Sequence, residues 1–369
     1  MFSLIAIYLR FGVLGFGGPF ALIAMMEEEF VEKRKWISAE KFLQTFSLIK
    51  VFPGATATQL AIYIAQYRAG KMAGFLCGVA FVLPSAFFVL LLSVFYNRVH
   101  QVSQMSSLFQ GMQIGALIVI AESVLRMARP YWGSTRAAII AAVSGLAIFL
   151  SPGWEPLLIL GFGLAGVARL DRRVAALGAF SIPGISSLNL TASASTTLKL
   201  SMTCLKAGFL VFGTGLAIIP VLEADIVGNH HWLTHAEFLD GLAIGQITPG
   251  PVTTTATFIG YKVAGFSGAF WATAAIFASA FVNILIILPI FEKRMTGSPR
   301  LKDFTDWAFP AVIGGIVATS LRLAISTVNT WYLAVSLACL AVILFKLRPP
   351  AWAFIPLSGC AIFGLSKLF

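Results

Sequence analysis

Two proline-glycine motifs carry the side chains of this chain that are best suited to holding an anion. Pro53-Gly54 is followed by Thr56, Thr58 and Gln59, and Pro249-Gly250-Pro251 is flanked by Gln246, Thr248, Thr253 and Thr254. A helix that begins after such a motif presents unpaired backbone N–H groups and roughly half a positive charge at its N-terminus. The motifs therefore predict two half-helices that bind a small anion, with kinked but otherwise ordinary helices as the alternative.

The two motifs occupy equivalent positions of an internal repeat. Phe16-Gly17, Trp36 and Pro53-Gly54 return 196 positions later as Phe212-Gly213, Trp232 and Pro249-Gly250. Arg10 and Lys206 match as basic residues at the same offset, and Glu27 matches Glu223. A repeat of about half the chain in a very hydrophobic sequence is typical of a transporter built from two related halves.

Three basic residues lie within or beside the apolar segments that carry the repeated motifs: Lys50, Arg10 and Lys206. A charged side chain at membrane depth costs about 2.5–3.5 kcal/mol on insertion scales, so it needs a partner or a function. We expect Lys50 to be the fixed charge of the anion site, with Arg10 and Lys206 in its surroundings. Snorkelling to the membrane interface is the alternative. The first breaks, at Gly17-Gly18-Pro19 and Gly213, are assigned to the same site.

The composition excludes a water-soluble protein. Of the 369 residues, 58% are hydrophobic and 11% are charged, and the mean hydropathy is +0.89. The 23 residues from Gly74 to Tyr96 carry no charge and are long enough to cross a membrane. The sequence therefore predicts an all-α polytopic membrane protein.

The chain divides into two homologous halves. We expect a first repeat over residues 1–173, a Ser/Thr-rich linker over 174–198 and a second repeat over 199–369. Each half should contain two helices broken by glycine and proline, re-entrant or discontinuous, followed by about four transmembrane helices. Parallel and inverted arrangements of the halves both stay open.

Other functional classes find little support. The net charge of +11 is scattered through short loops, as the positive-inside bias predicts, and does not indicate a nucleic-acid partner. The four cysteines lack ligand-like spacing. His231 and His235 are four residues apart, but the group around Trp232 falls short of the ligand count of a closed metal site, so we expect no metal and no cofactor. A nucleotide-binding Walker motif is absent, and so is a nucleophile–base pair, so we expect neither ATP hydrolysis nor another enzymatic activity.

Acidic residues that could carry a proton are few. Glu122 lies in an otherwise apolar stretch and is the candidate for proton coupling, although an ion pair with Arg126 four residues later is the simpler account. The acids Glu27, Glu28 and Glu29 follow the first break. They are expected either in a solvated loop or in gating ion pairs with residues 33–35.

The order and spacing of these motifs resemble the chromate transporter family. The resemblance rests on Phe16-Gly17-Gly18-Pro19, Trp36, the run Pro53-Gly54-Ala55-Thr56-Ala57-Thr58-Gln59 and the run Gly245-Gln246-Ile247-Thr248-Pro249-Gly250-Pro251. It covers both halves. It implies a long, two-domain member that exports chromate across the inner membrane, driven by the proton-motive force.

Two alternatives to chromate export stay open on the sequence. The substrate is sulfate or another oxyanion in one of them, because sulfate and chromate share tetrahedral geometry and charge. In the other, an anion channel uses the half-helices as a selectivity filter. The oligomeric state is also open, and a homodimer in the lipid bilayer is compatible with the sequence.

Overall fold

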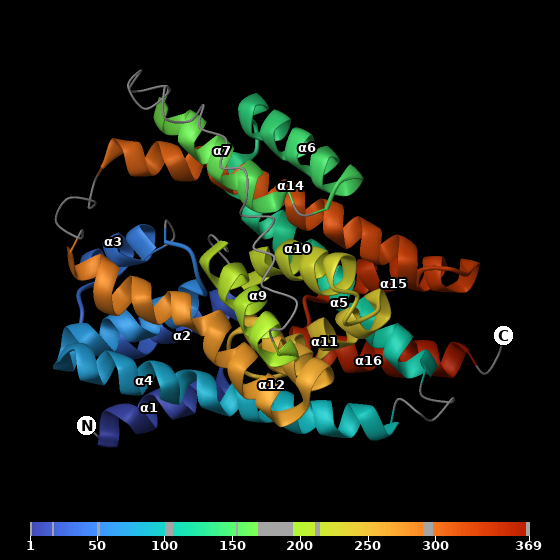
Figure 1. Ribbon diagram of the computed structural model, residues 1–369, viewed down its shortest axis with the longest axis horizontal. Coiled ribbons are helices and arrows are strands. Elements are labelled where there is room, and N and C mark those ends of the chain that lie inside the picture. The colour runs from blue at the N-terminus through green and yellow to red at the C-terminus, as the bar shows by residue number, and fades with distance from the viewer. Residues whose placement is uncertain are drawn as a thin grey trace.

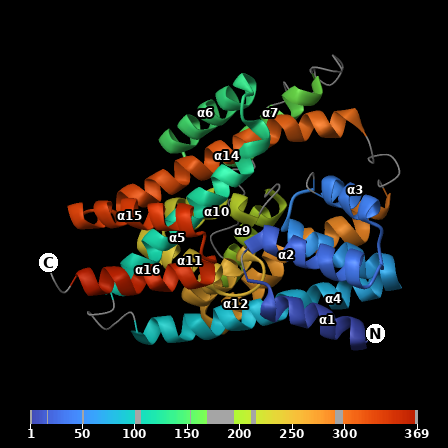
Figure 2. The same ribbon diagram turned by 180° about the vertical axis from the view of Figure 1, so that it is seen from behind.

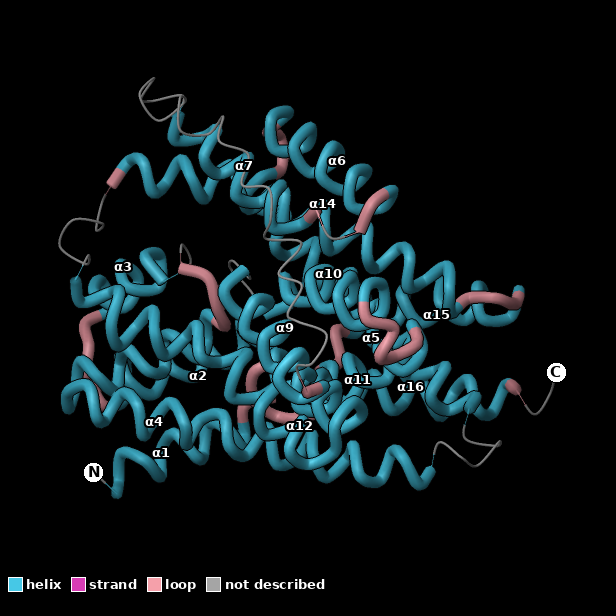
Figure 3. The backbone as a smooth tube through the Cα atoms, viewed as in Figure 1, coloured by secondary structure: helices cyan, strands magenta, loops and turns pink. Residues whose placement is uncertain are grey.

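The computed structural model describes residues 2–16, 18–49, 52–99, 106–152, 154–168, 195–210, 215–290 and 298–366. Almost all of this part of the chain is helical, and none of it forms a β-strand (Figure 3). The prediction of an all-α membrane protein is confirmed.

The first half contains α1 (Phe2–Leu14), α2 (Gly18–Glu27), η1 (Glu28–Lys33), α3 (Ala39–Ile49), α4 (Thr56–Val99), α5 (Ser106–Ala128), η3 (Arg129–Tyr131), α6 (Thr135–Leu150) and α7 (Glu155–Ala168). The second half contains α9 (Thr196–Leu210), η4 (Gly215–Ala217), α10 (Ile218–Glu223), η5 (Ala224–Asn229), α11 (His235–Ile247), η6 (Val252–Thr254), α12 (Thr255–Val282), η7 (Asn283–Ile287), α14 (Pro299–Thr327), α15 (Trp331–Leu347) and α16 (Ala351–Leu365). Helices end before the proline-glycine motifs because proline cannot donate the backbone hydrogen bond that a continuous helix needs.

Helices α4 and α12 each reverse direction near their beginning. The reversals occur at Gly70, whose φ is 85°, and at Gly265, whose φ is 62°, and glycine adopts this backbone conformation without steric cost. After the reversal in α12, Thr273 returns to lie 2.7 Å from Thr257 between their hydroxyl oxygens. Each element is therefore a helical hairpin with a short first arm and a long second arm.

The short arms also pair with the preceding helices. In the first half, the Arg68 guanidinium lies 5.7 Å from the centre of the Trp36 ring, which joins the end of the short arm to the start of α3. In the second half, Lys262 forms an ion pair of 3.0 Å with Glu237 at the start of α11. The helix before each proline-glycine motif and the short arm after it thus form another hairpin. The motif is the tip of this hairpin, and its two open ends lie together.

The first helices of each half are folded back in the same way. Tyr8 of α1 stacks on Phe30 of η1 with 5.5 Å between ring centres. In the second half, Lys206 of α9 lies 2.8 Å from Asp225 of η5. In the sequence, the Phe-Gly motifs of the repeat lie between these paired helices.

The two halves are inverted relative to each other. A Cβ atom on Gly74 of α4 would lie 3.0 Å from Leu285, and one on Gly78 would lie 2.8 Å from Phe281. Since residue numbers rise on α4 as they fall on the facing helix, the long arms of these equivalent elements run antiparallel. The colours of Figure 1 show the same opposite directions.

The halves are also interleaved. Helix α14 of the second half packs along α6 and α7 of the first, while α5 of the first half packs along α16 of the second (Figures 1 and 2). Glycine permits the close approach, since a Cβ on Gly314 would lie 2.2 Å from the Ala141 carbonyl oxygen. The site between the halves is therefore framed by helices from both repeats.

Four helical segments of the described chain are long and apolar enough to cross a membrane: Thr56–Tyr96, Ser106–Tyr131, Val252–Ile290 and Lys302–Thr327. Five more apolar helices, among them α6, α7, α15 and α16, are shorter. A multi-pass membrane protein follows from this set. The number of crossings in each half stays a prediction.

Candidate functional site

The tip of the second-half hairpin contacts the first half directly. The Gly250 amide donates a hydrogen bond of 2.9 Å to the carbonyl oxygen of Gly15, which lies at the first break of the other repeat. Gly250 has a φ of +99°, and a Cβ there would lie 2.6 Å from the Cβ of Ser85 on α4. Only glycine fits both the backbone conformation and the space.

The tip of the first-half hairpin makes the equivalent contact with the second half. Gly54 has a φ of +124°, and a Cβ there would lie 3.1 Å from the hydroxyl of Ser279 on α12. The Pro53 carbonyl oxygen accepts hydrogen bonds from the side-chain amides of Gln59, at 2.7 Å, and Asn283. Each tip is therefore held against the long helix of the opposite half.

Several polar groups around the tips are already hydrogen-bonded. Thr248 and Thr254 donate to the carbonyl oxygens of Gly245 and Pro251, at 3.1 and 2.8 Å. Thr254 also lies 3.0 Å from the hydroxyl of Ser85. These threonines stabilise the turn itself, as the alternative interpretation of the motif holds.

Four other predicted site residues keep a buried polar atom that has no hydrogen-bond partner among the described residues. These atoms are Thr58 Oγ1, Gln59 Oε1, Gln246 Nε2 and Thr253 Oγ1, and all four residues are less than 8% exposed. An unsatisfied buried polar atom costs about 1–3 kcal/mol, so such a group calls for a ligand or water. Two hydroxyls and one amide among them are hydrogen-bond donors, and this chemistry suits an oxyanion.

The remaining predicted site residues differ in their setting. Lys50, Gly17 and Gly213 lie outside the described residues, while Gly18 and Pro19 open α2. Lys206 has its charge compensated by Asp225, which also accepts a hydrogen bond from Asn229. Arg10 is exposed and lines a small cavity of about 130 Å³ together with Glu28, Glu29, Lys33 and Arg34.

The expected ion pairs after the first break form locally. Lys33 lies 2.7 Å from Glu28, and Arg34 lies 2.6 Å from Glu29. The hydrogen bond and the charge of Lys33 lower the pKa of the exposed Glu28 carboxyl. These pairs belong to one short helical segment and its end.

Glu122 pairs with Arg126, and both line a cavity of about 680 Å³ that also contains Gln246. The side chains of Glu122 and Arg126 are 30% and 45% exposed. The cavity joins the surface to the end of α11, immediately before the second-half tip.

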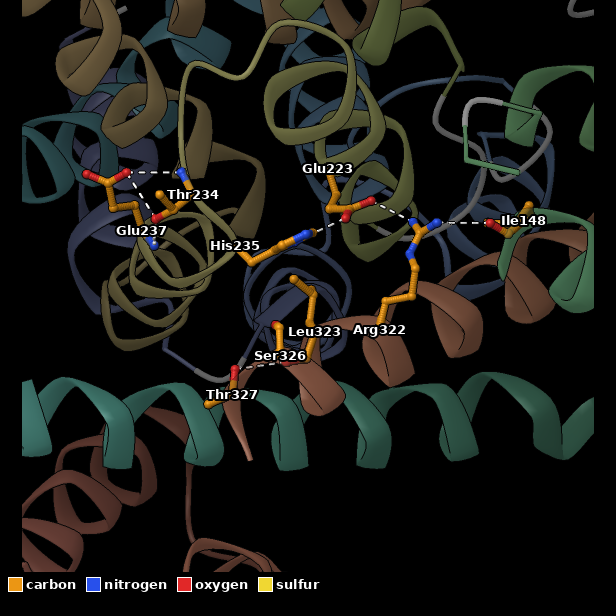
Figure 4. A network of polar contacts seen from close by, with 9 residues as sticks. All are labelled: Ile148, Glu223, Thr234, His235, Glu237, Arg322, Leu323, Ser326 and Thr327. Carbon is orange, nitrogen blue, oxygen red and sulfur yellow. Dashed lines mark hydrogen bonds and ion pairs between the residues drawn. The ribbon is translucent and has the colours of Figure 1, made fainter. Parts of the chain in front are cut away.

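The internal repeat matches Glu223 with Glu27, but the sequence analysis did not predict the buried ion pair that Glu223 forms. Figure 4 shows Glu223 of α10 between Arg322 of α14, at 2.6 Å, and His235, at 3.3 Å. Arg322 also donates to the Ile148 carbonyl oxygen at 3.0 Å, so the group ties three helices to the start of α11. The repeat contained the signal, because Leu125-Arg126 returns as Leu321-Arg322 at the offset of 196.

Asp240 on α11 is a second buried carboxylate that sequence reasoning missed. It is 1% exposed and accepts hydrogen bonds from Tyr96, at 2.7 Å, and Gln113, at 2.8 Å. Both donors come from the first half. The signal available in the sequence was a single acid in the otherwise apolar run that leads to Gln246.

The loop before α11 is structural in character. Thr234 and Glu237 form a reciprocal cap at the start of the helix. Burial raises the pKa of Glu237, but hydrogen bonds from Thr234 and the ion pair with Lys262 outweigh it, and the net shift is downward. Within the described ranges, no group of three or more His, Cys, Asp and Glu side chains could hold a metal ion.

Comparison with known proteins identifies relatives along the whole chain. The sequence model of the chromate transporter family matches residues 2–167 and again residues 198–365. A chromate transport protein of Cupriavidus metallidurans is 33% identical over 98% of this chain and 92% of its own length. A probable chromate transport protein of Synechococcus elongatus is 33% identical over 84% and 81%, and a chromate transport protein of Pseudomonas aeruginosa is 31% identical over 87% and 80%.

No solved structure matches this chain. An inverted pair of apolar helical repeats is typical of repeat transporters as a class. The chain belongs to the chromate transporter family. It is accordingly a transport protein and not an enzyme.

Proposed function

We propose that this protein exports chromate from the cytoplasm across the inner membrane, as a secondary carrier driven by the proton-motive force. The observation that carries the proposal is that each hairpin tip contacts the long helix of the opposite half, and that Thr58, Thr253 and Gln246 keep buried donors without a hydrogen-bond partner among the described residues. Chromate transport proteins are relatives over most of the chain, which supports chromate as the substrate.

The anion is held by backbone and side-chain donors at the two tips. The helix beginning after each motif adds its positive end, and Lys50, three residues before Pro53 in the sequence, adds a fixed charge. Gln246 holds the equivalent place at the second tip, so the site is charged on one side and neutral on the other.

Proton coupling requires a carboxylate that exchanges its proton during transport. Glu122 is the candidate that we infer from the sequence. Glu223 and Asp240 are further candidates because both are buried. Asp240 is hydrogen-bonded to Tyr96 of the other half, and Glu223 to Arg322 of another helix. The three differ in exposure, so neutral amide replacements of each can be compared in one assay.

Flux of labelled chromate and labelled sulfate into proteoliposomes, with an imposed pH gradient of either sign, tests the proposal. A chromate exporter gives saturable flux that reverses with the pH gradient and exceeds the flux of sulfate. Flux that follows only the electrochemical gradient of the anion indicates a channel, and a preference for sulfate indicates a sulfate carrier. Either result rejects the proposed function.

A further inference from the structure

The cavity that contains Gln246 is strongly basic at its outer end. Among the described residues, its charged lining consists of Arg126 on α5, Arg129 on η3, Arg348 after α15 and one acid, Glu122. We refer to these four residues as the arginine vestibule. Three guanidinium groups against one carboxylate leave two positive charges in excess around a recess of about 680 Å³.

The inner end of the vestibule is closed by the second-half tip. Gln246 is 7% exposed, Val252 and Leu216 are 2% exposed, and all three line the cavity. Within the described part of the chain, the side-chain amide nitrogen of Gln246 has no hydrogen-bond partner. A path therefore leads from exposed arginines to a buried donor beside Pro249-Gly250.

The backbone of Arg348 is strained at the position that brings its side chain to the vestibule. It has φ 49° and ψ 47°, in the left-handed region that non-glycine residues rarely adopt. It also precedes Pro349, and a residue before proline prefers extended backbone. Strain of this kind persists where a function or the surrounding structure maintains it, and it clusters at binding sites.

The arginines are available to a ligand to different degrees. Within the part of the chain that the structure describes, neither Arg129 nor Arg348 forms an ion pair with an acidic side chain. Arg126 is hydrogen-bonded to the Glu122 carboxylate one helical turn earlier. A carboxylate and a tetrahedral oxyanion present similar oxygen pairs to a guanidinium group, so they compete for it.

We propose that the arginine vestibule is a separate oxyanion-binding site, at which the substrate is captured before it reaches the hairpin tips, and that the Glu122 carboxylate is a tethered competitor for Arg126. The inference rests on the proposed function, because it names a capture site for the same class of substrate. Arginine binds an oxyanion through two parallel N–H donors, and a positive recess raises the local anion concentration. Gln246 supplies the donor that receives the anion at the inner end.

Isothermal titration of the purified full chain with sodium sulfate, and separately with sodium chromate, tests the vestibule. Arg129→Gln and Arg348→Gln should each raise the Kd by about 5- to 30-fold, the range expected for loss of one charge-assisted hydrogen bond in a partly exposed site. Glu122→Gln should lower the Kd several-fold, because Arg126 loses its competitor. In proteoliposomes the two arginine variants should raise KM and leave kcat nearly unchanged.

Arg136→Gln is the matched control. Arg136 is also an exposed arginine, but it packs over the Trp307 ring at 5.0 Å and does not line the vestibule. If Arg129→Gln and Arg348→Gln change the Kd no more than Arg136→Gln does, the arginines are solvated surface charges and the inference is wrong. An unchanged or higher Kd for Glu122→Gln rejects the tethered competitor.

The titration separates this inference from the proposed function. Sulfate and chromate binding that depends on Arg129 and Arg348 supports the vestibule even if proteoliposomes show channel-like flux. Conversely, saturable chromate export with arginine-independent binding retains the proposed function and removes the vestibule.

Discussion

Leu43 and Leu239 hold equivalent positions in the two repeats, yet Leu43 is 54% exposed and Leu239 is completely buried. The difference extends along their helices. Helix α11 packs against α5, α14 and α16 in the middle of the molecule, whereas α3 packs mainly on α4 of its own half. Because the halves are inverted copies, a change in which α3 becomes buried and α11 becomes exposed would move access to the anion site from one membrane face to the other.

Cysteine labelling tests that change. With Cys339 and Cys360 replaced by alanine, a maleimide should label Leu43→Cys rapidly and Leu239→Cys slowly. Addition of chromate and a pH gradient should slow labelling of Leu43→Cys and speed labelling of Leu239→Cys, because α3 becomes buried as α11 becomes exposed. Met72→Cys, at an exposed position near the reversal of α4, serves as the reference. Labelling rates that ignore substrate and gradient would mean that the asymmetry is static.

The glycines at the hairpin tips should tolerate no side chain. Gly54→Ala and Gly250→Ala each place a Cβ on a backbone with φ of +124° or +99°, and in Gly250→Ala the Cβ also meets Ser85. Strain of this kind costs about 1–3 kcal/mol, and we expect a lower Tm and at least a tenfold loss of chromate flux. Gly161→Ala on α7 is the control, because its Cβ would meet open space. Equal flux in all three variants would show that the tips adapt freely.

The buried ion pair between Glu223 and Arg322 should be stronger than the exposed pair between Glu122 and Arg126. Glu223→Gln leaves the Arg322 charge uncompensated in a buried position and should cost about 3–5 kcal/mol of stability. Glu122→Gln, which removes the exposed partner of Arg126, should change stability by less than about 1 kcal/mol. Thermal unfolding in detergent compares the two variants.

The double variant Glu223→Leu/Arg322→Met separates packing from function. Replacement of both charges by apolar groups should recover most of the stability, since an isolated buried charge no longer remains. Recovery of chromate flux together with stability would show that the pair only holds the helices. A stable but inactive protein would assign the pair a part in transport.

Local backbone chemistry explains why breaks in the helices could be predicted from the sequence while the contacts of the broken segments could not. The motif Pro249-Gly250 removes a helical hydrogen bond by its local chemistry, so the sequence predicts a break or kink there and the repeat predicts a second one. Asp240 is different, because its donors Tyr96 and Gln113 lie 144 and 127 positions away along the chain. The inverted arrangement was also hidden, since basic residues are nearly balanced between loops and orientation depends on that bias.

Asp240→Asn should weaken the contact between the halves. The carboxylate accepts hydrogen bonds from Tyr96 and Gln113 on its two oxygens, and an asparagine keeps one acceptor while turning a second donor toward them. We expect a loss of about 1–3 kcal/mol in unfolding free energy. If Asp240 also carries the proton, the variant should move chromate down its own gradient without a response to pH. Gln44→Asn, at the exposed equivalent position in the first half, should change neither property.

Lys50→Gln should raise the KM for chromate and abolish chromate resistance in cells while leaving expression normal. The substitution copies Gln246, the residue at the equivalent place of the second repeat, so polarity is kept and only the charge is removed. A charge-assisted hydrogen bond is worth about 1.5–3 kcal/mol, which corresponds to roughly a 10- to 150-fold higher KM. Lys50→Arg should retain partial activity, because the charge is kept while its geometry changes.

The reciprocal change, Gln246→Lys, should be tolerated less well, because Gln246 is 7% exposed and a second cation there would need its own partner. Uptake kinetics in proteoliposomes measure all three variants. If Lys50→Gln transports chromate with unchanged KM and kcat, the anion is held by backbone dipoles, hydroxyls and the Gln246 amide alone. Lys50 would then be a side chain that snorkels to the membrane interface, and the charged side of the anion site would have to come from the arginine vestibule.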